Sequence, residues 1–382
     1  MSASNHAQTQ RAADGASAPP AVAIVGAGIV GLSIALHLAQ RGARVSVIDQ
    51  RDGVPPCTDG AFAMLIATQP DGPQAFNALY GRAIDAWHAF DADFEGALGV
   101  RWEGALMWAA EADAAARLDA QRVRLASWGS AVERLDADNF AAFCAGVETG
   151  PIAGGYGSLR HGVVDPARVW RAMRTRCVAL GVAFETRAPL ARIELRASRE
   201  SALPRAAISG VDADVVVIAA GEGTAALTAS VGATVPYEVV SGSLAHSRPV
   251  PLRPLPALVG PQLSIKQNAD GRIVAGLDYA PGAACDDTSA AYGEALLAAA
   301  RARVPGLPPL ELERVTHGRV PIPQDSQPIV GFLDGVANCY VAVMMSGVTM
   351  APLMGRLIAD EITSGGRDAL LEPYAPSRFA SA

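Results

Sequence analysis

Lysine is almost absent from this chain of 382 residues. Of its 31 basic residues only Lys266 is a lysine, and all the others are arginines. The net charge is -7, so the chain has no overall positive charge with which to attract nucleic acid or an anionic membrane. We therefore expect a small-molecule partner and no nucleic acid. A homo-oligomer or a hetero-oligomer is left open by the composition.

Cysteine and histidine are also sparse. The five cysteines lie far apart without a C-x-x-C pair, and the six histidines form neither H-x-x-x-H nor H-E-x-x-H. These spacings exclude a zinc ribbon, a redox-active disulfide and a paired-histidine metal site, so we expect no metal. Free thiols are typical of a reducing compartment, which predicts a cytoplasmic protein. Cys57 is expected to be an ordinary loop thiol.

Long apolar runs are missing too. Residues 21–39 are nearly all apolar, but they contain three glycines and His37 and lead into a polar-ended strand, unlike a transmembrane helix. No other segment reaches about 18 uninterrupted apolar residues. Residues 1–20 are rich in Ala, Ser, Gln and Pro and lack the apolar centre of a signal peptide. We expect them to form a disordered leader.

Residues 21–50 have the pattern of a dinucleotide-binding strand–turn–helix–strand unit. A short apolar strand leads into G-x-G-x-x-G and a helix, and a second strand ends at Asp49. The glycines allow a tight turn, close approach of the backbone to a pyrophosphate and close packing of the helix on the strand. The helix N-terminus attracts phosphates, and Asp49 can accept hydrogen bonds from an adenosine ribose. The residues predicted to bind this part of a dinucleotide are Gly26, Ala27, Gly28, Ile29, Val30, Gly31, Asp49 and Gln50.

The rest of the chain alternates helical and extended patterns. We expect helices at 75–90, 111–128, 165–181, 288–304 and 350–363. Strands are expected at 100–109, 131–135, 182–186, 190–195, 215–219, 238–246, 263–267, 272–279, 311–319 and 340–344, with 53–60 a loop and 268–271 a hairpin turn. The segments typical of a parallel sheet come in separated blocks. One nucleotide domain (21–70, 155–235 and 317–364) therefore has a second, substrate domain (71–154 and 236–316) threaded through it, and 365–382 form a C-terminal tail.

The glycine motif continues with Ala35 and Gly42, and this extended pattern resembles the fingerprint of FAD-binding enzymes. A nicotinamide enzyme can contain the same strand–helix–strand unit, so the motif by itself leaves FAD and NAD open.

Three later segments resemble the D-amino acid oxidase (DAO) family, the group of glycine oxidase, sarcosine oxidase and D-amino acid dehydrogenase. They are HGVVDPARVWRAMRTRCVALGVAF (161–184), ADVVVIAAGEGTAAL (213–227), and HGRVPIPQDSQPIVGF (317–332) with the strand and helix at 340–362. The resemblance covers nearly the whole chain past residue 20. It implies FAD as cofactor and an α/β fold, with a Rossmann-type FAD-binding domain and an interleaved α+β substrate domain of mainly antiparallel sheet.

The resemblance also implies further cofactor contacts. Thr58 would touch the phosphates, and the turn at 346–349 would present its N–H groups to the isoalloxazine ring; a plain strand–helix connection is the alternative for that turn. The further residues implied are Thr58, Ala63, Met64, Leu190, Ala220, Gly221, Ser346, Gly347, Val348 and Thr349. Asp59 is unexpected beside a phosphate and is given no role. Met345 departs from the family, whose members often carry a polar residue there.

The implied reaction is oxidation of the C–N bond of a small amino or imino acid (a D-amino acid, a glycine- or sarcosine-like compound, or an opine) by hydride transfer to flavin. No catalytic side chain is assigned. Arg319 matches the family's carboxylate-binding arginine, although it lies one residue further from Asp325 than in several relatives, and a structural ion pair is the alternative. We expect Lys266 to be a solvated hairpin lysine, and it is a weak candidate for binding the substrate or influencing oxygen reactivity.

Weaker candidates and other functions complete the prediction. Tyr237, His246 and Tyr279 are weakly supported as pocket residues, and His317 is expected to be a strand residue. A flavin hydroxylase would need a late Gly-Asp turn, where this chain has Ser346 and Gly347, and an NAD-dependent dehydrogenase would leave the C-terminal segments unexplained. A flavin-dependent 2-hydroxy acid dehydrogenase and a flavin subunit of a hetero-oligomeric dehydrogenase stay open. The substrate and the electron acceptor are not specified by the sequence.

Overall fold

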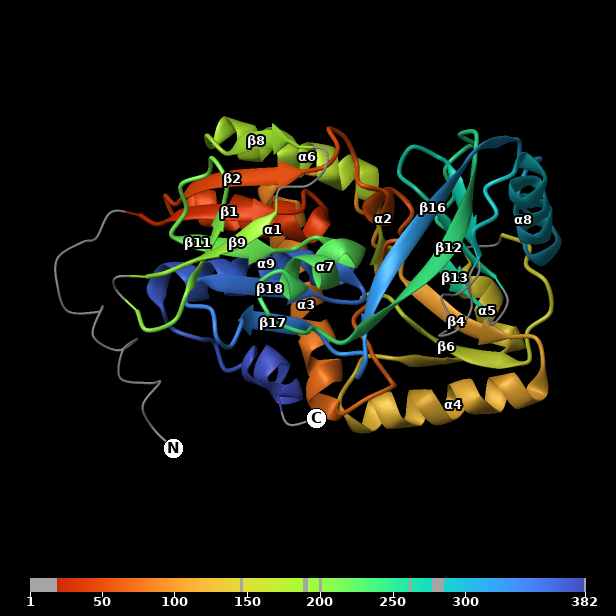
Figure 1. Cartoon of the computed structure of the whole chain (residues 1–382). Coiled ribbons are helices and arrows are strands. Elements are labelled where there is room, and N and C mark those ends of the chain that lie inside the picture. The colour runs from red at the N-terminus through yellow and green to blue at the C-terminus, as the bar shows by residue number, and fades with distance from the viewer. Residues whose placement is uncertain are drawn as a thin grey trace.

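Two large β-sheets organise the chain (Figure 1). The structure is a computed structural model and describes residues 19–144, 147–187, 192–198, 201–260, 263–276 and 285–380. The first sheet has six strands in the order β17-β18-β11-β1-β2-β8, parallel except for β17. Its strands are β1 (Ala21–Val25), β2 (Arg44–Asp49), β8 (Ala183–Thr186), β11 (Val215–Ile218), β17 (Ile329–Phe332) and β18 (Cys339–Val343).

Both faces of the six-stranded sheet are covered, which is why β1 and β18 consist of continuous apolar runs. One face packs in a single apolar cluster with α1 (Ile29–Gln40), α3 (Gln74–Asp93), α6 (Pro166–Ala179) and α9 (Gly347–Ser364). The other face lies against β9 (Ile193–Arg196), β10 (Arg205–Ile208) and α7 (Thr224–Ala229). Helices α1 and α9 approach closely, because a Cβ on Gly355 would lie 2.2 Å from the Oγ of Ser33.

The second sheet has eight strands in the order β16-β12-β15-β14-β13-β4-β6-β5 and is antiparallel except between β13 and β4. Its strands are β4 (Ala105–Ala109), β5 (Glu133–Leu135), β6 (Gly154–Ser158), β12 (Tyr237–Ser247), β13 (Ala257–Val259), β14 (Ser264–Gln267), β15 (Ile273–Gly276) and β16 (Leu312–Pro323). Helix α8 (Ala290–Arg303) packs on one side of this sheet. Two further helices, α4 (Ala112–Ser127) and α5 (Ala137–Phe143), flank the sheet near β6 and β5.

Short elements lie between the two sheets. Helix α2 (Pro56–Asp59) contacts β16, and the small pair β3 (Met64–Leu65) and β7 (Gly162–Val163) lies beside α9 and β4. At the closest point, Gly60 after α2 abuts Gly318 of β16, because a Cβ on Gly60 would lie 2.5 Å from the backbone nitrogen of Gly318. Because neither glycine has a Cβ, α2 and the second sheet can approach until their backbones are in contact.

The expected fold class is confirmed, as is the hairpin at 268–271. The structure also has elements that were not expected, among them α5, β6, β10, α7, β13 and β17. Some boundaries differ. The loop expected at 53–60 contains helix α2, and the strand expected from residue 100 begins only at Ala105. Helix α9 begins at Gly347 and not at 350, since the small residues 347–349 adopt its first turn.

The expected domain boundaries need correction at three elements, β6, β16 and α3. Strand β6 and the whole of β16 pair within the eight-stranded sheet, although 155–235 and 317–364 were assigned to the nucleotide domain. Helix α3, assigned to the substrate domain, instead packs with α9 in the cluster on the six-stranded sheet. The sheet in which a strand pairs decides the domain to which it belongs. For a strand between two domains, its own residues do not reveal that pairing.

The expected C-terminal tail is packed against the first sheet. It forms two short 3-10 helices, η3 (Glu372–Tyr374) and η4 (Pro376–Phe379). Leu371 and Tyr374 are buried, and Arg367 donates to both carboxylate oxygens of Glu361 at 2.9 Å. Residues 1–18 of the expected leader lie outside the described residues.

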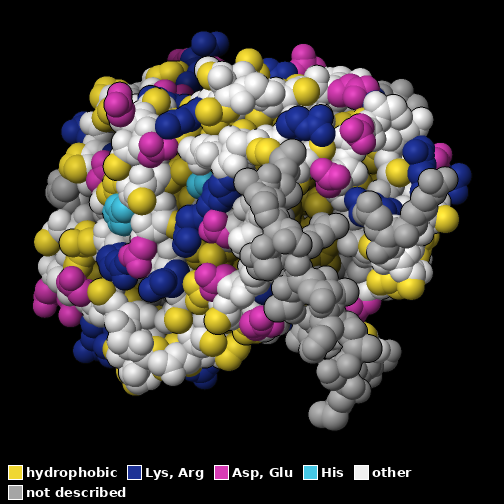
Figure 2. All heavy atoms as spheres, turned by 90° about the vertical axis from the view of Figure 1, so that its left-hand side faces the viewer, with side chains coloured by type: hydrophobic (Ala, Val, Ile, Leu, Met, Phe, Trp, Pro, Cys, Tyr) yellow, Lys and Arg dark blue, Asp and Glu magenta, His cyan; other side chains and the backbone are white. Residues whose placement is uncertain are grey.

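Two surface features bear on partners. Within the described part of the chain, no helix combines the length and apolar character needed to cross a membrane. On the face shown in Figure 2, acidic and basic side chains are interspersed with apolar ones. The acidic surplus of the sequence is thus spread over this face.

Candidate functional site

The turn after β1 is built by glycines that admit no side chain. Gly26 has φ +111, and a Cβ there would lie 2.3 Å from the carbonyl oxygen of Ala219 at the end of β11. A Cβ on Gly31 would lie 2.0 Å from the carbonyl oxygen of Gly26. A Cβ placed on Gly28 would have the Thr58 Oγ1, at 3.8 Å, as its nearest non-neighbouring atom. The backbone at the start of α1 is therefore open to a ligand. This cradle fits a pyrophosphate.

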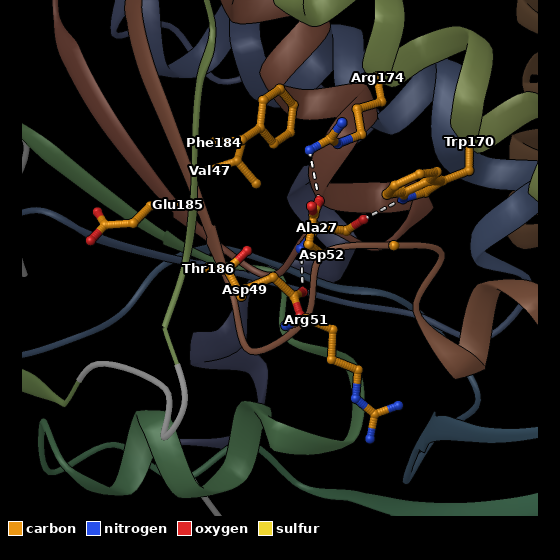
Figure 3. A pocket seen from close by; sticks show the side chains of 11 residues that line it. Ala27, Val47, Asp49, Arg51, Asp52, Trp170, Arg174, Phe184, Glu185 and Thr186 are labelled. Atoms are coloured by element: carbon orange, nitrogen blue, oxygen red, sulfur yellow. Dashed lines mark hydrogen bonds and ion pairs between the residues drawn. The ribbon is translucent and has the colours of Figure 1, made fainter.

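Asp49 closes the unit at the end of β2. Its carboxylate accepts the N–H of Ala27 at 2.7 Å and the N–H of Arg51 at 3.1 Å. From α6, Trp170 donates its Nε1–H to the carbonyl of Ala27 at 2.6 Å. Figure 3 shows Asp49 and Trp170 converging on Ala27, while Arg51 points away. A hollow opens here, lined by Ala27, Val47, Asp49, Arg51, Asp52, Gly53, Trp170, Arg174, Phe184, Glu185 and Thr186.

This hollow suits the adenosine end of a dinucleotide. It combines an acidic hydrogen-bond acceptor with the apolar rings of Trp170 and Phe184. Gln50, the next residue in the chain, is exposed at its edge. Leu190, also predicted to contact the cofactor, lies outside the described residues.

Helix α2 lies against the glycine turn. Thr58 is buried and its Oγ1 accepts the N–H of Ile29 at 3.2 Å, at the N-terminus of α1. Asp59 points instead toward β16, where Arg314 donates to it at 2.7 Å, so its charge is neutralised away from the cradle. Burial raises the pKa of the Cys57 thiol to about 11, which leaves it protonated and unreactive.

The two loops predicted to surround an isoalloxazine ring contact each other. Ala63 and Ser346 are non-glycine residues with φ +55, a left-handed conformation that is uncommon for residues other than glycine. The hydroxyl of Thr349 donates to the carbonyl of Met64 at 2.9 Å, and Tyr80 donates to the Oγ of Ser346 at 3.1 Å. Helix geometry leaves the N–H groups at 347–349, in the first turn of α9, without partners inside the helix.

The end of β11 completes this ring of segments. Ala219 abuts Gly26, and the chain then passes through Ala220 into the 3-10 turn η2 (Gly221–Gly223), where Gly221 has φ +56. A Cβ on Gly347 would lie 3.1 Å from Val30, which joins α9 to α1. The described residues predicted to bind FAD therefore form one continuous surface along the carboxyl ends of β1, β2 and β11 and the first turn of α9.

The expectation that Lys266 is a solvated hairpin lysine is wrong. Its side chain is 1% exposed, and its ammonium donates to the carbonyl of Val164 at 2.5 Å. The Nζ lies 5.5 Å from the centre of the Phe62 ring, beside the loop of Ala63. Burial lowers the pKa of Lys266 to about 7, while the carboxylates of Asp165 and Asp270 act in the opposite direction.

His246 is buried on β12, separated from Lys266 by strand β15. Its Nε2 is 2.7 Å from the Oγ1 of Thr316, and its Nδ1 has no hydrogen-bond partner among the described residues. Burial first, and then the charge of Arg314, lowers the pKa of His246 to about 3, so the imidazole is neutral at physiological pH. Val274 of β15 lies between His246 and Lys266, and all three are in register on the same side of the sheet. That His246 lines a pocket stays a prediction.

Arg319 is half-exposed and forms an ion pair with Glu222 of η2. Tyr237, another weak pocket candidate, donates its hydroxyl to the carbonyl of Glu222 at 2.7 Å. His317 lies in β16, with its Nδ1 3.3 Å from the Ser243 hydroxyl and its Nε2 3.5 Å from Asp286. Tyr279 lies outside the described residues. The structure thus does not bring Arg319 and Lys266 together.

Some residues of the site were missed by sequence reasoning. Trp170 and Tyr80 contact the predicted cofactor residues Ala27 and Ser346 through hydrogen bonds between distant parts of the chain. Glu222, beside Gly221, is bonded to Tyr237 and Arg319. His161 is fully buried and accepts the N–H of Ala67 at 2.8 Å, which no motif signals. The described residues contain no cluster of three side chains suited to hold a metal ion.

Comparison with known proteins gives consistent matches. Residues 21–361 match the DAO family, described as FAD dependent oxidoreductase. A glycine oxidase from Bacillus licheniformis is 25% identical over 349 residues, which are 89% of this chain and 92% of that protein. The crystal structure of glycine oxidase from Geobacillus kaustophilus has a TM-score of 0.82 at 22% identity and covers 94% of this chain and 99% of its own. Iminodiacetate oxidase from Chelativorans sp. BNC1 has a TM-score of 0.78 at 23% identity, covering 93% of this chain and 98% of its own.

Proposed function

Because the chain belongs to the DAO family of FAD-dependent oxidoreductases, we propose that it oxidises the C–N bond of a small amino or imino acid. The substrate class comprises D-amino acids, glycine- or sarcosine-like compounds and opines. The observation that carries this proposal is the ring of FAD-binding segments that faces a buried lysine on the second sheet. The glycine oxidase and iminodiacetate oxidase relatives, which are named for amino- and imino-acid substrates, support the same class.

The residues present fit FAD. The cradle at Gly26, Gly28 and Gly31 would hold the pyrophosphate, with Thr58 and the N-terminus of α1 beside it. Asp49 would accept hydrogen bonds from the ribose, in exchange for the Ala27 N–H that it accepts in this structure. Ala63, Met64 and the first turn of α9 would enclose the ring.

The protein's own part in the reaction is to bind and orient the substrate. Bound FAD supplies a two-electron acceptor for the hydride released when a C–N bond is oxidised. The chain needs to hold the substrate carbon in place, to exclude bulk water and to bind the carboxylate, whereas a strong base is not required. The N–H groups at the N-terminus of α9 favour negative charge beside the ring.

A cytoplasmic location is part of this proposal. It is supported by the cysteines, because Cys57, Cys144, Cys177, Cys285 and Cys339 are all free thiols, as expected in a reducing compartment.

Anaerobic reduction of the purified holoprotein tests the proposal. We expect a yellow protein whose flavin absorbance bleaches with at least one small amino or imino acid and returns when a suitable acceptor is added. Exposure to air after bleaching separates an oxidase from a dehydrogenase. A flavin that is bleached by a 2-hydroxy acid and by no amine would contradict the C–N assignment, and a colourless protein that binds NAD would contradict the cofactor.

A further inference from the structure

The two sides of the eight-stranded sheet face different surroundings. On one side, Ile265 of β14 and Ala275 of β15 pack with Leu296 and Leu297 of α8. On the opposite side, Lys266 is in register with Val274, and Val274 is in register with His246. Since side chains alternate along a strand, Lys266 and His246 both point away from α8. They point toward α2 and the Phe62–Met64 loop, where the FAD ring would lie.

Lys266 is a buried cation without an acidic partner among the described residues. Its nearest carboxylates, Asp165 and Asp270, influence it only through space. An ammonium has three N–H donors, and a single acceptor, the carbonyl of Val164, is present for them. A buried, unpaired charge is costly, so this position favours an anionic ligand. The other basic side chains nearby, Arg314 and Arg101, already pair with Asp59 and Glu103.

Arg319 points to the other side of the same sheet. Gly318 abuts Gly60 of the FAD-facing segment, so alternation turns the next side chain, Arg319, toward the α8 side. Its guanidinium already has a carboxylate partner in Glu222, at the turn that carries Gly221. Tyr237 holds the same turn through the carbonyl of Glu222 and the N–H of Ala225. Arg319 and Tyr237 together fix η2 against the second sheet.

We propose that Lys266 binds the substrate carboxylate, and that Arg319 is a positioning residue that holds the Gly221–Gly223 turn through Glu222. This assignment rests on the proposed function, and it narrows the substrate. The described side chains facing the ring supply one unpaired cation, which fits a substrate with a single carboxylate, such as a glycine- or sarcosine-like monocarboxylate, better than a dicarboxylate.

The experiment compares Lys266→Met and Arg319→Met holoproteins, titrated with acetate as the carboxylate probe through the shift in flavin absorbance. We expect Lys266→Met to weaken acetate binding by about 100-fold and to leave FAD affinity unchanged, because it removes a buried charge from the substrate side. Arg319→Met should change acetate affinity by less than about threefold, as it removes an exposed pair, while it lowers FAD affinity. Lys266→Arg should restore acetate binding to within about tenfold, because the charge returns.

The pH dependence of acetate binding in the unmodified holoprotein gives a second test that needs no variant. With a pKa of about 7 for Lys266, acetate affinity should fall about tenfold for each pH unit above 7. The groups facing this position from neighbouring elements are Asp165, Asp270, His246 and the Arg314–Asp59 pair. His246, with a pKa of about 3, stays neutral throughout. In Lys266→Arg the dependence should disappear up to pH 9.

Unchanged acetate affinity in Lys266→Met, or affinity independent of pH from 6 to 9 in the unmodified protein, overturns the assignment. Loss of acetate binding in Arg319→Met with normal FAD affinity overturns it as well and makes Arg319 the anchor. The proposed function and the role of Lys266 can fail separately. If no amine bleaches the flavin but Lys266→Met loses acetate binding, the C–N oxidation is contradicted and carboxylate binding by Lys266 is supported. If amines bleach Lys266→Met as fast as the unmodified protein, only carboxylate binding by Lys266 is contradicted.

Discussion

The two sheets contribute different kinds of groups to the proposed site. At the six-stranded sheet this site consists mainly of backbone, namely the glycine turn, the η2 turn and the start of α9, above a core of apolar residues. The eight-stranded sheet buries polar side chains among its strands, including Ser243, His246, Ser264, Lys266 and Thr316. Under the proposed function, backbone groups would hold the cofactor and side chains of the second sheet would bind the substrate.

The sheets also treat buried charge differently. Beside the six-stranded sheet, Glu361 accepts from Arg367 and from the hydroxyl of Tyr340 at 2.7 Å, so the buried carboxylate is fully partnered. In the eight-stranded sheet Lys266 lacks any such acid among the described residues. The paired carboxylate of Glu361 therefore contributes to stability, whereas the unpaired ammonium of Lys266 is available to bind an anionic ligand. The predictions below test this contrast, beginning with the largest expected effect.

Gly31→Ala should abolish FAD binding and destabilise the fold. Its Cβ would lie 2.0 Å from the Gly26 carbonyl oxygen, which no side-chain movement can relieve. Gly81→Ala is a matched control, because Gly81 is also helical and a Cβ there meets nothing within 4 Å. It should raise stability by up to about 1 kcal/mol through helix propensity. Flavin content and thermal melting check both; normal flavin in Gly31→Ala would contradict the backbone cradle.

Glu361→Ala should lower the free energy of unfolding by about 3 kcal/mol, because Arg367 and the Tyr340 hydroxyl lose the carboxylate that accepts their hydrogen bonds. Urea denaturation measures the loss. Glu372→Ala is the control, because its carboxylate is 64% exposed and lies 3.9 Å from Arg367. Equal effects of the two substitutions would show that burial does not decide the contribution of these pairs.

Acid should destabilise the protein through His161. Its Nδ1 accepts the Ala67 N–H, so protonation breaks that bond, and burial lowers its pKa from 6.5 to about 3. The unfolded chain then binds the proton first, so stability is full above pH 6.5 and is lost as pH falls toward 3. His161→Gln should reduce the slope by about 1.4 kcal/mol per pH unit between pH 6 and 4.5.

Denaturant titrations at several pH values provide this measurement. The control is His88→Gln, because His88 is exposed and stacks on Trp102 with 3.9 Å between ring centres. It controls for the replacement of a histidine at an exposed site. An unchanged slope in His161→Gln would mean that His161 is protonated equally in the folded and unfolded states.

Asp49→Asn should weaken FAD binding by about tenfold to 30-fold, since a charged acceptor for the ribose becomes a neutral amide. FAD fluorescence during titration of the apoprotein gives the dissociation constant. Asp52→Asn is the control on the same loop, because its carboxylate is 73% exposed and pairs with Arg174 at the rim of the hollow. If both variants lose FAD alike, general charge and not the position of Asp49 explains the effect.

The same contrast explains what the sequence could predict. The cradle residues Gly26, Gly28 and Gly31 act within one local unit, so their spacing already specifies their geometry. The orientation of Arg319 depends on the pairing of β16 and on the Gly60–Gly318 contact, neither of which is local. Lys266 was expected to be a solvated hairpin lysine, and this expectation was wrong because its burial comes from Phe62 and Val164, about 100 residues or more away in the chain. Domain boundaries at β6 and β16 differed for the same reason.

The contact between Gly60 and Gly318 has a consequence for how the site can be altered. Main chain meets main chain there, so the distance between α2 and β16 is set by atoms that no substitution can shorten. A larger residue at either position would act as a spacer and push β16 away from the segment that follows α2. Engineering of the proposed substrate site can therefore enlarge this spacing through Gly60 or Gly318 but can reduce the space only through the side chains around it.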